Sequence, residues 1–425
     1  MLDMALVRTS PNVIRDMLRK RHIEYPLDKL LELDKERRRL VSEVQELKRK
    51  RNIVSAEIAE MKKQKLDAEK KIQEMKDISQ HIASSDENIR NLEQRLHNLV
   101  TELPNIPHES VPDGVGEDDN VELRRWGEPT AFDFKPRDHI DLAEHLDLVD
   151  LERASKVAGA RFYFLKGELV RLNYALIRFA LDFLVDRGWI LIQPPYMLKR
   201  DAIEGSIILS DFEDVIYKIE GEDLYLIGTS EHAIAAMRMN EVLTREEVPL
   251  RYAGVSPCFR KEAGAHGRDT KGVFRVHQFE KIEQFVFSRP EDSWDELESM
   301  IGNAEDFFKA LEIPYRIVAL CGGELGKVSA KTYDLEAWFP GQDKYREVVS
   351  CSNCTDYQAR GLLVKFREKP HEPSKFVHTL NSTLVATERT LIAIMENHQK
   401  KDGSIEIPEA LRPYTSGLKV IEPGR

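Results

Sequence analysis

The sequence predicts an α+β protein in which a long helical hairpin precedes a domain built on an antiparallel β-sheet flanked by helices. Apolar residues recur in heptad steps over residues 33–99, and neither proline nor glycine interrupts residues 27–103. Beyond residue 130, amphipathic helical patterns alternate with short β-rich runs. Strand-like runs far outnumber possible crossover helices between Tyr252 and Phe366, which favours antiparallel pairing.

Length and composition restrict the class of protein. A chain of 425 residues suits two or three domains, and 41% hydrophobic with 32% charged residues is typical of a globular protein. No apolar run reaches 18 residues and the first residues lack a signal-peptide core, so we expect no membrane span and a cytoplasmic location. Four cysteines are too few for a disulfide framework.

Two runs of apolar residues define the hairpin. The first steps by four and three residues through Leu33, Arg37, Leu40, Val44, Leu47, Arg51, Val54, Ile58 and Met61. The second passes through Ala68, Ile72, Met75, Ile82, Ile89, Leu92, Leu96 and Leu99, with Ser79 and Asp86 interrupting it. The polar stretch 62–67 marks the tip. Helices of about 35 residues are about 50 Å long, so the sequence predicts a coiled-coil arm.

The charge of this arm differs from that of the whole chain. The net charge of the protein is −11, yet residues 27–100 hold 17 Lys and Arg against 15 Asp and Glu. Basic clusters at 37–39, 48–51 and 62–63 could bind a phosphate backbone. Solvated coiled-coil flanks or a dimerisation rod would show the same pattern, so the periodicity leaves these alternatives open.

The remaining chain divides into a linker and a second domain. Residues 104–130 are rich in Pro, Gly, Asp and Glu, so we expect an N-terminal domain over 1–103, a linker over 104–130 and a second domain over 131–425. Within the second domain we expect a helix over 169–187. The predicted strands include 189–192, 224–227 and 285–287.

Three segments of the second domain carry unusual chemistry. The first, 188–196, is a helix end, a β run and then two prolines, which is typical of an edge strand. The second, 258–283, looks like a β-hairpin, and residues two apart on a strand share a face. We therefore expect Arg260 with Glu262, and Arg275 with Phe279, to point alike. Such charge is costly in a dry core, so it indicates a charged ligand or, alternatively, a surface salt-bridge ladder.

The third segment, 381–397, ends in an apolar helix whose first turn contains Arg389. An arginine beside the positive end of a helix dipole is unfavourable unless an anion offsets it. A bound polyphosphate would be such an anion.

The three segments, in this order, resemble the three signature motifs of class II aminoacyl-tRNA synthetases. Pro195 stands where motif 1 has its dimer-interface proline, Arg260 and Glu262 where motif 2 begins, and Arg389 where motif 3 has its arginine. With Thr229-Ser230-Glu231, Glu347-Val348-Val349-Ser350 and the N-terminal hairpin, the resemblance to the seryl-tRNA synthetase family covers essentially the whole chain. It implies a class II antiparallel catalytic domain with a tRNA-binding arm.

The resemblance implies that ATP and Mg²⁺ bind at the motifs. It gives Arg260 the α-phosphate, Arg389 the γ-phosphate, and Phe279 a stacking contact with adenine. The implied nucleotide-binding residues are Arg260, Glu262, Val276, Phe279, Glu347, Val348, Val349, Ser350 and Arg389. Among them Glu347 is the implied Mg²⁺ ligand, because this hard cation prefers oxygen donors.

The resemblance also implies a small polar pocket for L-serine. The implied residues are Thr229, Ser230, Glu231, Arg275, Glu283, Asn381 and Thr383. Arg275 suits the serine carboxylate, and Glu283 with Glu231 suit the ammonium and hydroxyl groups, although the residue that recognises the hydroxyl stays open. Arg260, Arg275 and Arg389 are the implied catalytic residues, and they act by positioning and charge neutralisation.

The implied activity is ligation of serine to tRNA(Ser), and also to tRNA(Sec), by a homodimer with no membrane association. The loop 263–272, with His266, Arg268 and Lys271, is expected to contact the tRNA acceptor end or to be a solvated loop. Two alternatives remain at this stage. One is a class II paralogue such as an amino acid:carrier-protein ligase, which would not need the arm. The other is a non-catalytic coiled-coil paralogue, in which the motif arginines should be lost.

Overall fold

The computed structural model describes residues 1–208, 215–262 and 272–423, and the chain forms two compact units. The smaller unit comprises Leu2–Arg19 and Ile23–Pro104. The larger unit comprises Met1, Lys20–His22 and Asn105–Arg425. The short segment before the arm therefore belongs, with everything after the arm, to the larger unit. In the described residues no helix is long and apolar enough to cross a membrane.

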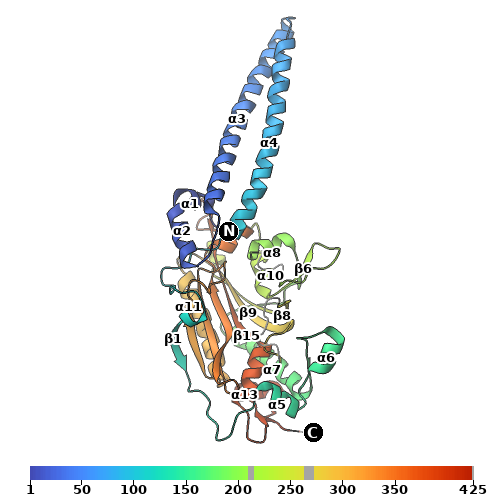
Figure 1. Cartoon of the computed structure of the whole chain (residues 1–425), viewed down its shortest axis with the longest axis vertical. Helices are drawn as coiled ribbons and strands as arrows, with labels where there is room; N and C mark the ends of the chain where they lie inside the picture. The colour runs from blue at the N-terminus through green and yellow to red at the C-terminus, as the bar shows by residue number, and fades with distance from the viewer. Residues whose placement is uncertain (209–214, 263–271, 424–425) are drawn as a thin grey trace. The chain divides into compact units, whose positions relative to one another are not determined.

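The smaller unit consists of four helices: α1 (Met4–Thr9), α2 (Pro11–Lys20), α3 (Leu27–Lys63) and α4 (Glu69–Glu102). The two long helices, α3 and α4, lie side by side as the hairpin predicted from the heptads (Figure 1). With 37 residues at about 1.5 Å each, α3 is about 55 Å long. The turn lies between the end of α3 and the start of α4, within the expected polar stretch.

One detail of the predicted seam is wrong. Ser79 and Asp86 do not interrupt the seam of α4, because their neighbours Ile78 and Ser85 occupy those positions and are buried. Heptad steps alternate between three and four residues, so a run with unequal steps allows two registers. The buried register continues through Leu92, Leu96 and Val100.

The larger unit is built on an eight-stranded sheet in the order β1-β10-β11-β12-β15-β9-β8-β4. Its strands are β1 (Val121–Trp126), β10 (Tyr315–Ala319), β11 (Lys331–Phe339), β12 (Lys344–Asn353), β15 (His378–Ala386), β9 (Gln278–Ser288), β8 (Leu250–Phe259) and β4 (Ile190–Ile192). All neighbours are antiparallel except β4 and β8, which are parallel. The antiparallel α+β fold is thus confirmed, and β4 is the predicted edge strand. The edge strand β1 comes from the expected linker.

Four small sheets accompany the large one. They are formed by β14 (Lys375–Phe376) with β13 (Lys365–Arg367) and β7 (Val242–Thr244), by β16 (Ile405–Glu406) with β17 (Val420–Ile421), by β2 (Val149–Asp150) with β3 (Phe164–Leu165), and by β5 (Met197–Lys199) with β6 (Leu224–Leu226). The predicted strand 224–227 therefore exists as β6, outside the large sheet. Short 3₁₀ turns are η1 (Glu117–Asp119), η2 (Arg245–Glu247) and η3 (Glu409–Thr415).

Helices cover both faces of the large sheet, because its strands direct apolar side chains to both faces. The described helices are α5 (His139–His145), α6 (Leu151–Ala158), α7 (Gly167–Val185), α8 (Arg200–Ser206), α10 (Ser230–Met237), α11 (Ser293–Ala310), α12 (Tyr357–Leu362) and α13 (Thr387–Asn397). On β9, Ile282 and Val286 join the main core with α7, α11 and α13. Phe285 and Phe287 point to the opposite face and join a second core with α10 and α12.

Candidate active site

A cavity of about 410 Å³ lies against strands β9, β12 and β15 of the large sheet, walled by α10, α13 and a loop containing residues 326–329. Most residues implied by the resemblance line it, namely Thr229, Glu231, Arg260, Glu262, Arg275, Val276, Phe279, Glu283, Glu347, Val348, Ser350, Asn381, Thr383 and Arg389. Segments separated by more than 150 residues thus contribute to a single cavity.

Two implied residues do not line the cavity. The side chain of Ser230 is fully buried in the first turn of α10, where a Cβ on Gly254 would lie 2.6 Å from its hydroxyl oxygen. Val349 alternates with its neighbours on β12 and points into the main core. His266, Arg268 and Lys271 of the expected tRNA-contacting loop lie outside the described residues.

The predicted hairpin exists as β8 and β9, but its charged residues lie beyond the paired strands. The ladder ends at the pair Phe259 and Gln278, and Glu262 has a left-handed backbone with φ of 51°. The Arg260 N–H still donates across the hairpin to the His277 carbonyl at 2.9 Å, but the strands then separate, because the N–H of Lys261 donates to the Val215 carbonyl and that of His277 to the Arg161 carbonyl. Arg260 with Glu262, and Arg275 with Phe279, therefore line one cavity as expected, but a regular two-residue strand repeat is not what places them there.

Three arginines converge on the cavity, and each is held in place by an oxygen acceptor. Arg260 donates from Nε to the Gly228 carbonyl at 3.2 Å, and its guanidinium lies 5.2 Å from the Phe279 ring centre. Arg275 pairs with Glu262 at 2.8 Å. Guanidinium groups fixed in this way are suited to bind phosphate or carboxylate oxygens in defined directions.

Arg389, in the first turn of α13, has an intramolecular anion as partner. Its Nη1 lies 3.2 Å from a carboxylate oxygen of Glu347 and donates to the Glu347 carbonyl at 3.0 Å. Phe274, which was not among the expected site residues, contacts the guanidiniums of both Arg389 and Arg346, which lie 5.0 and 3.7 Å from its ring centre. Glu347 thus offsets part of the positive charge expected to require a bound anion.

Carboxylates on β11 and β12 lie beside these arginines. Loss of bulk water opposes ionisation of Glu347, but Arg389 and Arg260 nevertheless lower its pKa. Burial, and then the charge of Glu347, raise the pKa of Asp334 well above its usual value. Asp334 stands opposite Ser350 in the ladder and was missed in the sequence, although its alternation with Glu336 along what is β11 was a signal.

The other end of the cavity is small, polar and buried. Asn381 and Gln358 both donate to one oxygen of Glu231, at 3.1 and 2.8 Å. Burial, and then the nearby Glu283, raise the pKa of Glu231 to about 7. The Thr229 hydroxyl accepts a hydrogen bond from the Glu231 N–H at 3.3 Å and so caps the N-terminus of α10.

The second buried glutamate of this end has a cationic partner. Lys281 lies 2.5 Å from Glu283, and the Thr383 hydroxyl donates to the same carboxylate at 3.4 Å. Both members of the ion pair are almost fully buried. Gln358 was not among the expected site residues, because its partner Glu231 lies far away in the sequence. Lys281 was not among them either, although it lies two residues from Glu283 on β9 and so shares a strand face with it.

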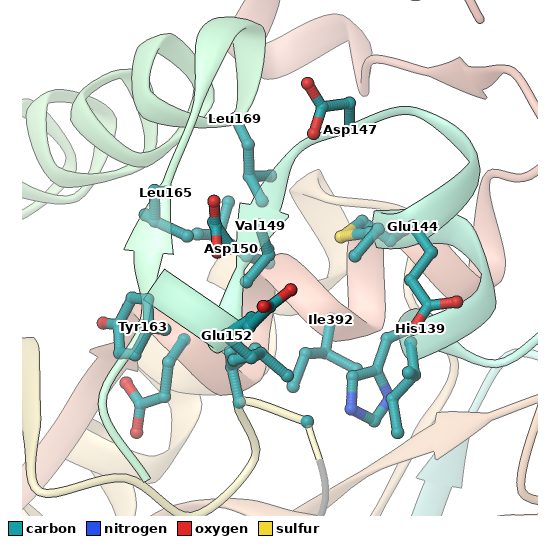
Figure 2. Close-up of a pocket in the computed structure, with 18 of the residues that line it drawn as sticks. His139, Glu144, Asp147, Val149, Asp150, Glu152, Tyr163, Leu165, Leu169 and Ile392 are labelled. Atoms are coloured by element: carbon teal, nitrogen blue, oxygen red, sulfur yellow. The ribbon is translucent and has the colours of Figure 1, made fainter. Parts of the chain in front are cut away.

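A second cavity, of about 300 Å³, lies between α5, α6, β3, α7 and α13. Figure 2 shows Glu144, Asp147, Asp150 and Glu152 around apolar residues such as Leu169. Acidic side chains repel phosphates, so this cavity does not suit a nucleotide, whereas the arginine-lined cavity does.

Comparisons with known proteins agree with this geometry. The family model of the tRNA synthetase class II core domain (G, H, P, S and T) matches residues 215–398, and that of the seryl-tRNA synthetase N-terminal domain matches residues 1–107. The serine--tRNA ligase of Nitrosopumilus maritimus is 56% identical, and the alignment covers 99% of this chain and 100% of that protein.

Two solved structures are similar over the whole chain. A crystal structure of seryl-tRNA synthetase from Pyrococcus horikoshii complexed with ATP matches with a TM-score of 0.94 and 47% identity, covering 100% of both chains. That of the cytoplasmic serine-tRNA ligase from Naegleria fowleri in complex with AMP has a TM-score of 0.89 and 39% identity, covering 100% of this chain and 99% of that one. The chain therefore belongs to the seryl-tRNA synthetase family.

Proposed function

We propose that the protein is a serine–tRNA ligase, which activates L-serine with ATP and transfers the serine to the 3′ end of tRNA(Ser). The observation that carries this proposal is the convergence of three arginines and two buried glutamates on one cavity of about 410 Å³. Arginines suit a polyphosphate and a carboxylate, and glutamates suit an ammonium group. The full-length similarity to serine--tRNA ligases supports the same activity.

ATP occupies the arginine end of the cavity. Arg260 binds the α-phosphate, Arg389 binds the γ-phosphate, and adenine stacks on Phe279. Glu262 and the backbone at Val276 orient the nucleotide. In support, Arg260 and Phe279 already lie 5.2 Å apart in a cation–π arrangement, so both are held where a nucleotide would use them.

Glu347 and Ser350 supply oxygen donors for Mg²⁺ on the same wall. The carboxylate of Glu347 is half-exposed beside Arg389, its pKa is lowered, and both Glu347 and Ser350 line the cavity. An ionised carboxylate and a hydroxyl fit the preference of Mg²⁺ for hard oxygen ligands alongside substrate phosphates. When bound there, the ion would neutralise phosphate charge.

Serine occupies the polar end. Arg275 binds its carboxylate, Glu283 and Glu231 bind the ammonium and hydroxyl groups, and Thr229, Asn381 and Thr383 complete the hydrogen bonds. The bonds from Asn381 and Thr383 to these glutamates hold the acceptors in fixed directions, which supports their assignment. A substrate without the hydroxyl would leave a buried polar group unpaired, so alanine is rejected strongly.

Neither chemical step needs a protein nucleophile. A serine carboxylate oxygen attacks the α-phosphorus of ATP, the bond to the bridging oxygen breaks, and pyrophosphate leaves as seryl-adenylate forms. A terminal ribose hydroxyl of the tRNA then attacks the acyl carbon, and AMP leaves. The preorganised charges of Arg260 and Arg389 stabilise the transition state of the first step.

The N-terminal domain binds tRNA through the arm formed by α3 and α4, while the segment 131–425 acts as the catalytic domain. An amino acid:carrier-protein ligase would have no use for this arm. Charging of tRNA(Sec) remains a prediction. The protein acts in the cytoplasm as a homodimer, and the exposed side chains of Ile190 and Leu191 on the edge strand β4 support a partner at that edge.

The proposal is tested by serine-dependent exchange between ATP and pyrophosphate. Serine should drive exchange at least about 100-fold better than alanine or threonine, as expected for a site that hydrogen-bonds a substrate hydroxyl in a small pocket. Glu283→Gln should abolish this exchange, and Glu220→Gln, an exposed residue outside the cavity, is the matched control. Equal exchange with alanine would refute the assignment of serine.

A further inference from the structure

Arg21 is a buried arginine whose only hydrogen-bond acceptors recorded in the described residues are backbone carbonyls. Its residue is 2% exposed and lies between α2 and α3, within the larger unit. It donates to the carbonyls of Asn105 at 2.7 Å, Leu325 at 3.1 Å, Gly326 at 3.3 Å and Ser329. Burial lowers its pKa to about 10, which shows that its charge is held at a cost.

Asn105, which follows the last helix of the arm, also binds this loop. Its side-chain amide donates to the Val328 carbonyl at 2.9 Å and to the Cys354 carbonyl at 2.8 Å. Its backbone N–H donates to the Lys327 carbonyl at 2.7 Å. The carbonyls of the loop 325–329 are therefore bound by two residues that flank the arm in sequence.

This loop forms a wall of the active-site cavity at its serine end. Residues 326–329 line the cavity. Cys354, whose carbonyl Asn105 binds, accepts a hydrogen bond at its sulfur from Asn381 at 3.5 Å. Asn381 in turn donates to Glu231 at 3.1 Å. A continuous series of hydrogen bonds thus leads from Asn105 to a carboxylate assigned to serine.

We propose that Arg21 and Asn105 are positioning residues for serine binding, which fix loop 325–329 and Cys354 and thereby set the geometry around Glu231. The inference rests on the proposed function. A buried cation without a carboxylate partner is an expensive way to stabilise a fold, since apolar side chains of similar volume often serve as well or better. Five donors in a rigid fork, however, can hold several carbonyls in one arrangement.

The adjacent Lys20 is a control that distinguishes positioning of the pocket loop from simple anchoring of the chain. Its ammonium group donates to the carbonyls of His108 and Glu109, each at 3.3 Å, and neither residue lines the cavity. Lys20 therefore tethers the same stretch of chain within the larger unit without holding the pocket loop. If tethering alone mattered, Lys20 and Arg21 would be equivalent.

The test measures KM for serine and KM for ATP by pyrophosphate exchange in the full-length protein, with thermal melting of each variant. Arg21→Gln and Asn105→Ala should raise KM for serine about tenfold and leave KM for ATP within about twofold, because the loop lies at the serine end. Arg21→Lys should recover part of the loss. Lys20→Ala should match the wild type in both constants.

Unchanged KM for serine in folded Arg21→Gln and Asn105→Ala would overturn the inference, as would an equal rise for Lys20→Ala. If the Arg21 variants do not fold, amide hydrogen exchange of the wild type decides: serine should slow exchange within 325–329, and unchanged exchange would overturn the inference. If the wild type showed no serine-dependent exchange between ATP and pyrophosphate, that result would instead count against the proposed function. The two failures are therefore distinguishable.

Discussion

The arm and the active-site cavity both carry many charges, but they hold them in opposite ways. In the arm, Arg37 and Glu93 pair across the hairpin with side chains 37% and 46% exposed. In the cavity, Lys281 and Glu283 pair with side chains 7% and 2% exposed. Exposed pairs contribute little to stability, whereas burying charges costs desolvation free energy that pairing often does not fully offset, so a buried pair in a cavity points to a functional role. The comparison assigns the chemistry to the cavity, whereas the exposed charges of the arm are available to bind a partner.

The largest expected effect comes from removing a cavity arginine. Arg260→Ala and Arg389→Ala should each lower serine-dependent pyrophosphate exchange by roughly 100-fold or more, about 3 kcal/mol, because one preorganised contact to the developing phosphate charge is lost. Thermal melting should show both variants folded. As a matched control, Arg39→Ala removes an arm arginine paired with Glu43 and should leave exchange unchanged. Normal pyrophosphate exchange in folded cavity variants would show that these arginines contribute no more to serine activation than the arm arginine does.

A smaller effect follows from Glu231, whose pKa is raised to about 7 by burial and then by Glu283. If its ionised form binds serine, KM for serine should fall roughly tenfold between pH 6 and pH 8, following the ionised fraction. Stability should fall as serine binding improves. The folded state binds an extra proton between about pH 4.5 and pH 7, so the free energy of unfolding decreases as pH rises through that window.

Two variants distinguish the contributions of Glu231 and Glu388, both of which have a pKa of about 7, to this pH dependence. Glu231→Gln should remove the pH dependence of KM for serine, whereas Glu388→Gln, whose own pKa of about 7 arises from burial, should preserve it. A wild-type KM that stays constant from pH 6 to pH 8 would show that the ionisation of Glu231 does not control serine binding.

The smallest effect is expected in the arm. Lys48 and Asp86 pair across the hairpin at 3.4 Å with both side chains exposed. A double-mutant cycle with Lys48→Ala and Asp86→Ala should give a coupling of about 0.5 kcal/mol or less in the free energy of unfolding, and less in high salt. A coupling of several kcal/mol would show that the arm depends on its ion pairs rather than on its apolar seam.

The sequence sufficed for the arm because its helices are stabilised by local periodicity. Heptads without proline or glycine predicted the hairpin and its turn, and the error at Ser79 and Asp86 was a slip of one residue in register. The same reasoning predicted the helix that exists as α7 and the edge strand β4.

The cavity could be predicted only in part, because its geometry depends on contacts between distant segments. Strand alternation placed Arg260 and Glu262 on one face, but hydrogen bonds to Val215 and Arg161 end the regular hairpin just after Arg260 and before Glu262. Resemblance to a family supplied the expected ligands. It did not indicate Gln358, which orients Glu231, or Arg21, which lies more than 300 residues from the loop it binds.

The division of labour between arm and cavity is tested most directly by replacing residues 29–99 with a short linker and comparing two activities of the same preparation. This change removes nearly all of α3 and α4 but keeps Arg21, Asn105 and every proposed ATP and serine ligand. Serine-dependent pyrophosphate exchange should stay within about twofold of wild type, while charging of tRNA(Ser) should fall by roughly 100-fold or more as phosphate and shape contacts are lost. Charging that persists alongside exchange would contradict the account, because the arm would then not hold the tRNA.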